Sequence, residues 1–257
     1  MDLGLSNSVC IVTGASKGIG RAVATRLASE GARIVAVARS ENLLRELTSG
    51  LPHGAQFLAC DLRDANAPAE VIAHTLERCG RIDALVNVAG ATKRGDFLEL
   101  TDADWQDGFA LKLFAAMRLC RAAWPHLVRT RGSIVNIAGI GGRTGSADFA
   151  IGGAVNAAVM NLTKVLADRG NRDGVRVNAV NPGSIATERL KNRIEAHARE
   201  HGTDSESAAR HMASRMGIER FGEPMEIAAT VAFLLSKAAG YCQGAIVDVD
   251  GGATRTM

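Results

Sequence analysis

Tyrosine is nearly absent from this chain. Phe, Trp and Tyr together make up 4% of its 257 residues, and Tyr241 is the only tyrosine. A tyrosine phenol is one of the side chains that enzymes use to donate a proton to a reacting group. If the protein is an enzyme, this scarcity leaves Tyr241 as its one candidate phenol.

The sequence also lacks a strong charge imbalance, paired cysteines and a long apolar run. Its net formal charge is only +3 and no basic run stands out, which argues against a nucleic-acid partner. We find no secretory signal pattern, and we expect no apolar run to reach the about 20 residues of a membrane span. We therefore expect a cytoplasmic protein with no membrane partner. Because no C-x-x-C pair is present, we expect reduced packing thiols at Cys10, Cys60, Cys79, Cys120 and Cys242.

Short runs rich in β-branched residues alternate with helical stretches along the chain. This alternation is typical of βαβ units, so it predicts a Rossmann-like α/β fold, a doubly wound parallel sheet with helices on both faces. No linker or repeat divides the chain, and we expect a single domain over residues 1–257. The predicted strands are 9–13, 33–38, 55–60, 83–88, 133–138, 175–180 and 245–250, and the predicted helices are 18–30, 64–79, 102–129, 153–169 and 224–236.

A polar, histidine-containing segment follows the sixth predicted strand. Residues 187–217, which we call the lid segment, predict two short helices joined near Gly202 and Thr203. Ligands bind at the carboxyl edge of such sheets, so we interpret this segment as a lid over a substrate cleft. The alternative is a solvated pair of helices without a role in binding.

A glycine-rich loop joins the first predicted strand to the first helix. The residues TGASKGIG, from Thr13 to Gly20, place glycines at 14, 18 and 20. Glycines let the backbone turn sharply and approach a pyrophosphate, whose charge then rests on a helix N-terminus. The position between a strand and a helix is the one that a dinucleotide site requires.

The end of the second strand indicates which dinucleotide binds. An acidic residue there would hydrogen-bond the free ribose hydroxyl of NAD, but this chain has Ala38-Arg39-Ser40, with Lys17 in the glycine loop. Two cations and no carboxylate favour the 2′-phosphate of NADP(H). The alternative is that Arg39 is only a surface cation.

Several motifs, in this order, resemble those of the short-chain dehydrogenase/reductase family, and the resemblance covers almost the whole chain. They are TGASKGIG, Asp61-Leu62, Asn87-Val88-Ala89-Gly90, NPGSIAT from Asn181 to Thr187, RFGEP from Arg220 to Pro224, and Asp250-Gly251-Gly252. The resemblance implies a seven-stranded sheet and a homotetramer or homodimer. With the glycine loop and the end of the second strand, it implies a cofactor site made by Gly14, Ser16, Lys17, Gly18, Ile19, Gly20, Arg39, Ser40, Asp61, Leu62, Asn87, Ala89, Gly90, Pro182, Gly183, Ile185 and Thr187.

The same resemblance implies four catalytic positions, and this chain differs at all of them. The family uses a tyrosine as proton donor, a lysine four residues later, a serine that orients the substrate and an asparagine on a central helix. The flanking residues place these at Gly152, Asn156, Gly139 and Lys112, respectively. Sliding the alignment to Phe149 supplies no hydroxyl. Loss of a general acid costs about 10²–10⁴ in rate.

Lysine and asparagine have exchanged places between positions 156 and 112. We hypothesise that Lys112 points into the cleft, where it binds cofactor hydroxyls or an anionic substrate or acts as an acid with a lowered pKa. Lys112 and Asn156 are therefore the candidate catalytic residues. The alternative is that the exchange of the two residues has no functional meaning, and that Lys112 faces solvent or lies in a subunit contact.

Other residues near these positions could enlarge the cleft or donate a proton. We expect glycines 139, 152 and 153 to enlarge the cleft beside the nicotinamide. Histidines of the lid segment could supply a proton when it closes. The alternative for each polar group is an ordinary surface residue; the candidates are His197, His201, His211, Arg143, Thr144, Ser146 and Asp148.

Two functions remain open from the sequence. The first is an NADP(H)-dependent oxidoreductase that acts on the carbonyl or hydroxyl of a small molecule through a non-standard proton donor. The second is an inactive NADP(H)-binding sensor or scaffold of the same fold. A lyase or isomerase has no positive support. Nothing in the lid segment or the loop at 91–97 names the substrate.

Overall fold

The computed structural model describes residues 2–255, which contain one seven-stranded parallel sheet. The strand order is β3-β2-β1-β4-β5-β6-β7, so the predicted doubly wound parallel sheet is confirmed. Each predicted strand is present, with bounds that differ by two residues at most. The strands are β1 (Val9–Thr13), β2 (Arg33–Ala38), β3 (Gln56–Ala59), β4 (Ala84–Asn87), β5 (Ser133–Ile137), β6 (Arg176–Pro182) and β7 (Ile246–Val249).

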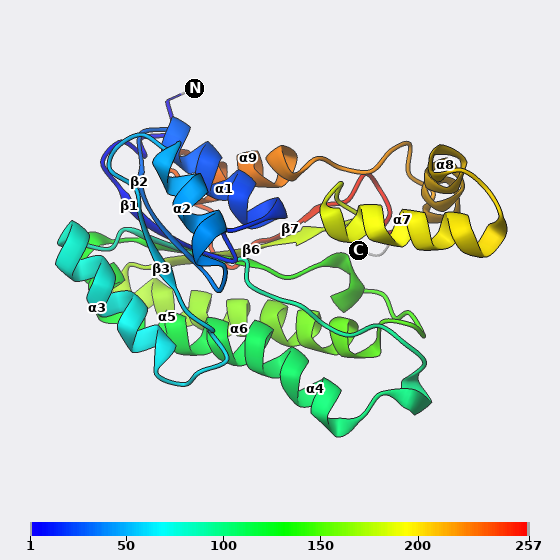
Figure 1. The fold of residues 1–257 in the computed structure, drawn as a ribbon. Coiled ribbons are helices and arrows are strands. Elements are labelled where there is room, and N and C mark those ends of the chain that lie inside the picture. Colours follow the sequence, from blue (N-terminus) through cyan, green and yellow to red (C-terminus); the bar gives the residue numbers. More distant parts are fainter. Residues whose placement is uncertain (1, 256–257) are drawn as a thin grey trace.

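Helices cover both faces of the sheet, as Figure 1 shows. One face carries α1 (Gly18–Ser29), α2 (Glu41–Ser49) and α9 (Pro224–Leu235), and the other carries α3 (Ala67–Cys79), α5 (Ala115–Thr130) and α6 (Ala150–Asp173). The strands are apolar because both of their faces are buried. All five residues of β1 are buried, and its register pairs Ile11 with Val35 of β2 and Leu85 of β4.

The chain reverses direction across the sheet between β1 and β4, which is where ligands bind in open α/β sheets. The side chain of Thr13 holds this switch point together. Its hydroxyl oxygen accepts hydrogen bonds from the backbone N–H groups of Val88 (2.9 Å) and Ala89 (3.1 Å). The loop after β4 is therefore fastened beside the glycine loop after β1.

The predicted helix at 102–129 is not one regular helix. α4 (Asp102–Phe109) leads into a π-helical turn (Ala110–Phe114), and α5 follows. Single π-turns inside helices often occur at functional sites, and this one carries Lys112. The sequence prediction also missed α2 and made α6 too short at both ends.

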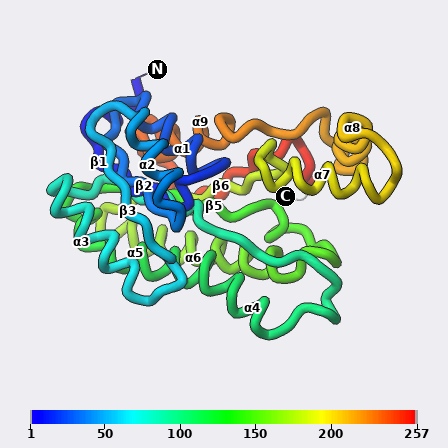
Figure 2. Tube along the Cα trace, in the orientation of Figure 1, coloured from blue at the N-terminus to red at the C-terminus, as the bar shows by residue number. Residues whose placement is uncertain are grey.

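The lid segment forms the two helices expected of it, α7 (Glu188–His201) and α8 (Ser205–Met216). Gly202, with φ +62°, ends α7, and the carboxylate of Asp204 caps α8 by accepting from Ser207 N–H. In Figure 2 this pair extends from the end of the molecule where the strands finish. Its action as a lid stays a prediction.

The expectation about apolar runs needs a correction. α6 is long and apolar enough to cross a membrane by length and composition. Here it packs along β6, and residues such as Val155 and Val159 are buried. Helices in the core of a soluble protein can have the same length and apolar composition. The cysteines are free thiols, as expected.

Candidate functional site

The glycine loop after β1 has the close backbone packing that a dinucleotide site needs. Gly14 and Gly18 adopt φ values of +63° and +52°, which other L-residues rarely do. A Cβ at Gly20 would overlap the carbonyl oxygen of Gly14. A Cβ at Gly18 would lie 3.1 Å from Cγ2 of Thr187. The structure thus brings the glycine loop and Thr187 together, although Gly18 and Thr187 are 169 positions apart in the sequence.

The N-terminus of α1 is free to receive a phosphate. Lys17 is its N-cap, no side chain caps the helix, and the first turn holds no acidic residue. Its unpaired N–H groups and the helix dipole attract an anion. The ammonium of Lys17 lies 2.8 Å from the carboxylate of Glu188, in the first turn of α7. This exposed ion pair links the glycine loop to the lid segment.

The end of β2 offers cations and hydroxyls rather than a carboxylate. The Arg39 side chain is 67% exposed and lies 4.0 Å from Asp61. Ser40 is the N-cap of α2, but its hydroxyl makes no capping hydrogen bond. Asp61 is held by Arg63, at 3.3 Å. The guanidinium of Arg39 and the hydroxyl of Ser40 fit a 2′-phosphate, whereas Leu62, next to Asp61, is buried in the core.

Two buried amide oxygens lack a donor among residues 2–255, and they are Asn87 Oδ1 and Asn156 Oδ1. The amide of Asn87 donates to Asn136 Oδ1 at 2.9 Å, so its orientation is determined. A buried acceptor without a donor costs about 1–3 kcal/mol. Hydroxyl or amide donors of a bound nicotinamide nucleotide would satisfy both oxygens, so the residues present fit such a cofactor.

Lys112 projects from the π-helical turn toward the ends of β4 and β5. Its Nζ donates a hydrogen bond of 2.7 Å to the carbonyl oxygen of Ala138. A Cβ at Gly90 would lie 2.9 Å from Cδ of Lys112, so glycine at 90 makes room for the lysine. Burial, together with the nearby charge of Arg189, lowers the pKa of Lys112 to about 7. Lys112 is thus directed away from solvent, and its role in cofactor binding or catalysis stays a prediction.

Asn156 approaches the same backbone segment from α6. Its Nδ2 lies 2.9 Å from the position that a Cβ of Gly139 would occupy. Lys112 and Asn156, which are 44 residues apart in the sequence, thus meet at Ala138-Gly139, directly after β5. The N–H of Gly139 donates to Asn181 Oδ1 at 3.2 Å, which ties this segment to β6.

The glycines at 139, 152 and 153 do not leave empty space, so this expectation was wrong. A Cβ at Gly152 would overlap the ring of Phe149, because that ring folds back over the first turn of α6. A Cβ at Gly153 would meet the carbonyl oxygen of Gly141 at 3.0 Å. Neighbouring groups occupy the volume beside these glycines.

Cations gather around Phe149. The guanidinium of Arg94 stacks 4.0 Å from the ring centroid and pairs with Asp148 at 2.6 Å. Burial, and after it the nearby charge of Arg94, lowers the pKa of Arg193 of α7, against the opposite influence of Asp148. Arg189, one turn earlier on α7, donates to the carbonyl oxygen of Gly90 at 3.1 Å. The face of α7 that meets the site is therefore cationic.

Several sequence candidates lie in other contacts. Arg143 pairs with Asp248 at 3.1 Å, and Ser146 hydrogen-bonds Asp148. The histidine rings of the lid segment contact one another. Tyr241 is fully exposed on the loop before β7.

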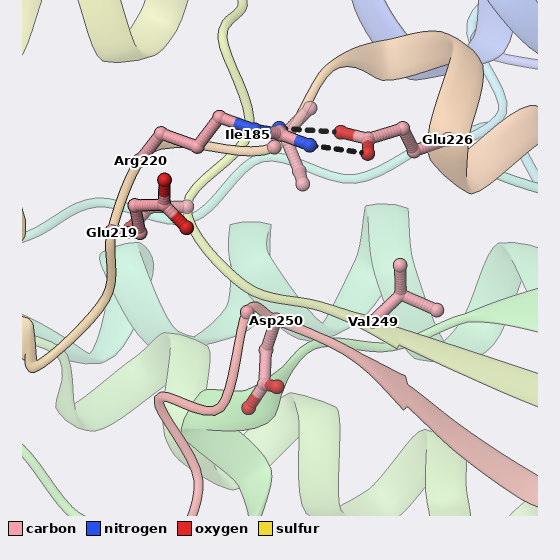
Figure 3. Close-up of a pocket in the computed structure, with 9 residues that line it drawn as sticks. Ile185, Glu219, Arg220, Glu226, Val249 and Asp250 are labelled. Atoms are coloured by element: carbon pink, nitrogen blue, oxygen red, sulfur yellow. Dashed lines mark hydrogen bonds and ion pairs between the residues drawn. The ribbon is translucent and has the colours of Figure 1, made fainter.

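Figure 3 shows a separate small cavity of about 190 Å³ between the segment after β6 and the end of β7. Arg220 directs two N–H groups at the carboxylate of Glu226, at 2.9 and 2.8 Å, and Asp250 lies across from them. Ile185, a predicted cofactor residue, lines this cavity, but no residue of the glycine loop does. The cavity is therefore not the dinucleotide site.

The arginines of α7 were missed by the sequence analysis. Their spacing could have identified them, because residues four positions apart, such as 189 and 193, lie on one face of a helix. Phe149 was noticed only as the nearest aromatic. Its role in filling the space over Gly152 depends on a ring orientation that no pattern encodes.

Comparisons with known proteins agree with this geometry. Residues 14–254 match the family described as Enoyl-(Acyl carrier protein) reductase. The chain is 34% identical to meso-2,3-butanediol dehydrogenase of Serratia marcescens over 252 residues, covering 96% of this chain and 95% of that protein. It is 35% identical to the short-chain reductase protein NovJ of Streptomyces niveus over 251 residues, covering 95% and 93%.

A similar solved structure is L-sorbose reductase from Gluconobacter frateurii, complexed with NADPH and L-sorbose. The TM-score is 0.95 at 33% identity, and the match covers 100% of both chains. An actinorhodin polyketide ketoreductase with NADPH matches with a TM-score of 0.91 at 32% identity, covering 97% of this chain and 98% of that one.

Proposed function

Since the chain belongs to the short-chain dehydrogenase/reductase family, we propose that this NADP(H)-dependent oxidoreductase reduces a small carbonyl compound with Lys112 as its proton donor. The cofactor is NADP(H), in keeping with the NADPH-bound reductases of the same fold and with Arg39 after β2. The remaining assignments concern this chain's own residues.

The observation that carries the proposal is the position of the Lys112 ammonium. It is held at the Ala138 carbonyl, its side chain lies against Gly90, and its pKa is lowered to about 7. A general acid works best when its pKa lies near the working pH. Lys112 has three N–H donors and uses one on Ala138, so others remain for a substrate oxygen.

The proposed reduction of the carbonyl group needs one hydride and one proton, and the protein supplies the proton. NADPH, when bound, would supply the hydride that reaches the carbonyl carbon. Lys112, in its ammonium form, donates a proton to the carbonyl oxygen, which becomes the alcohol, and the neutral amine then recovers a proton from water. Asn156 lies against the backbone of Gly139 from α6. Glycine at 152 takes no part in the proton transfer.

The substrate that we propose carries a negatively charged group. Arg193 is partly buried, lies near Arg94, and makes no ion pair with any of residues 2–255. A partly desolvated cation without a partner is costly, and a carboxylate or phosphate would offset that cost with charge-assisted hydrogen bonds. Arg189 lies one helical turn away, where it would attract the same group.

A Lys112→Met variant tests the proton donor. With a panel of acidic and neutral carbonyl compounds followed by NADPH absorbance, we expect kcat to fall by about 10²–10⁴. The Kd of NADPH, measured by fluorescence, should stay within about twofold, and Lys164→Met, an exposed lysine of α6, serves as the matched control. An unchanged kcat in Lys112→Met would refute the assignment.

An inactive NADP(H)-binding sensor or scaffold is the second candidate. The stacking of Phe149 over Gly152, with Arg94 over the ring, favours it because these side chains cover that turn of α6. Tight NADPH binding without turnover of any compound in the panel would support this second function.

A further inference from the structure

The lid segment carries a cluster of metal-ligating side chains that the proposed reaction does not use. His197, Glu200 and His201 lie on α7, with spacings of three and four residues that place them on one face of the helix. One ligand atom from each lies within 4.8 Å of the others. We propose that these three residues bind a divalent transition metal ion, with Zn²⁺ as the best match.

Hydrogen bonding prepares one imidazole for this role. His201 Nδ1 lies 3.0 Å from the backbone carbonyl oxygen of His197, so the N–H at Nδ1 donates to it. The lone pair of His201 is then at Nε2, which points away from that bond. A histidine that ligates a metal usually donates its other ring N–H to a carbonyl or a carboxylate. The helix itself therefore selects the tautomer that can bind a metal.

The other two ligands are also available. The imidazole of His197 lies beside that of His201, with ring centroids 4.0 Å apart. Glu200 forms no ion pair with any of residues 2–255, so its carboxylate is free to ligate. The exposed side chains can rotate to bring their ligand atoms to the about 2.0–2.2 Å of a zinc site.

The chemistry of this donor set decides the class of metal. Two imidazole nitrogens and one carboxylate suit Zn²⁺, Co²⁺, Ni²⁺ or Cu²⁺, whereas Mg²⁺ and Ca²⁺ prefer oxygen ligands throughout. Three protein ligands leave the fourth position of a tetrahedral zinc ion open.

His211 of α8 lies beside this cluster but is not one of the three residues whose ligand atoms lie within 4.8 Å of one another. Its ring lies 5.8 Å from the ring of His197 and nearly parallel to it, at 9°. It is the only one of the three histidines that comes from α8. A metal bound by both helices would fasten α7 to α8 across the short connection at 202–204, and would make the lid segment more rigid.

Calorimetric titration of chelator-treated full-length protein with ZnCl₂ tests the proposal. We expect one Zn²⁺ per chain, unaffected by excess Mg²⁺. His197→Ala, His201→Ala and Glu200→Gln should each weaken binding about tenfold or more, and His211→Ala should weaken it less. The control is His53→Asn, because residue 53 is exposed, lies outside the lid segment and has φ +63°, which asparagine tolerates.

Unchanged Zn²⁺ affinity in His197→Ala and His201→Ala would overturn the proposal, and so would an equal loss in His53→Asn. Circular dichroism of each variant checks that it is folded. NADPH binding is measured on the same samples and should not change. The proposal of a metal site and the proposal of an oxidoreductase function are therefore tested independently.

Discussion

The ammonium group of Lys112 and the backbone carbonyl of Ala138 form a hydrogen bond of 2.7 Å between the π-helical turn and the end of β5. This bond directs a lysine away from solvent and toward the edge of the sheet where the strands end. The same segment receives Asn156 from α6. The ammonium of Lys112 and the amide of Asn156 thus lie at the same backbone segment after β5. The regular helix predicted at 102–129 gave no indication of this arrangement.

The rate of carbonyl reduction should depend on the protonation of Lys112. Its folded-state pKa is lowered to about 7, and only the protonated form can donate. We therefore expect kcat for reduction to be highest below pH 7 and to fall as the pH rises through about 7. The measurement is kcat from pH 5.5 to 9 with saturating NADPH. An identical pH profile for the residual activity of Lys112→Met would contradict this prediction.

Replacing Arg39 should weaken NADPH binding selectively. Its exposed guanidinium stands after β2, where no carboxylate follows directly. A charge-assisted hydrogen bond is worth about 1.5–3 kcal/mol, so Arg39→Ala should raise the Kd of NADPH by about 10- to 100-fold. The Kd of NADH should stay nearly the same, because NADH lacks the phosphate. Equal losses for both nucleotides would show that Arg39 supports the fold and not the phosphate.

Adding a methyl group at Gly152 should destabilise the protein. Alanine normally stabilises a helix relative to glycine, but here its Cβ would overlap the ring of Phe149. We expect Gly152→Ala to lower the free energy of unfolding by about 1–3 kcal/mol, measured by urea denaturation.

Two comparisons isolate the cause of this loss. In a Phe149→Ala background the same change should cost little, because the ring is gone. Gly145→Ala is the matched control, since a Cβ there would meet nothing within 4 Å. Equal effects of Gly152→Ala with and without Phe149 would contradict the prediction.

Removing the charge of Glu188 should improve NADPH binding. Its carboxylate pairs with Lys17, whose position in the glycine loop is beside the helix end expected to hold the phosphates. An exposed ion pair is weak, so Glu188→Gln should lower the Kd of NADPH by no more than about fivefold. The effect should diminish at high salt, because exposed charges are screened. Weaker binding in this variant would mean that the ion pair helps to hold the cofactor.

Much of the fold follows from local pattern. The runs at 9–13 and 33–38 became strands with the expected bounds, because apolar β-branched segments between helices have few alternatives to a buried parallel strand. The two helices of the lid segment were likewise predictable from Gly202 and its polar surroundings. The π-helical turn at 110–114 was not, because nothing in its local sequence distinguishes it from a regular helix.

The sequence by itself determined which groups this protein contains: a glycine loop, an arginine after the second strand, a single tyrosine, a lysine at 112 and an asparagine at 156. Only the tertiary structure decided where those groups act. It turned Lys112 onto Ala138, folded Phe149 over Gly152, and placed the arginines of α7 beside the loop after β4. The reason is physical: periodicity reports which face of an element is buried, whereas the direction of a long side chain depends on distant segments that pack against it.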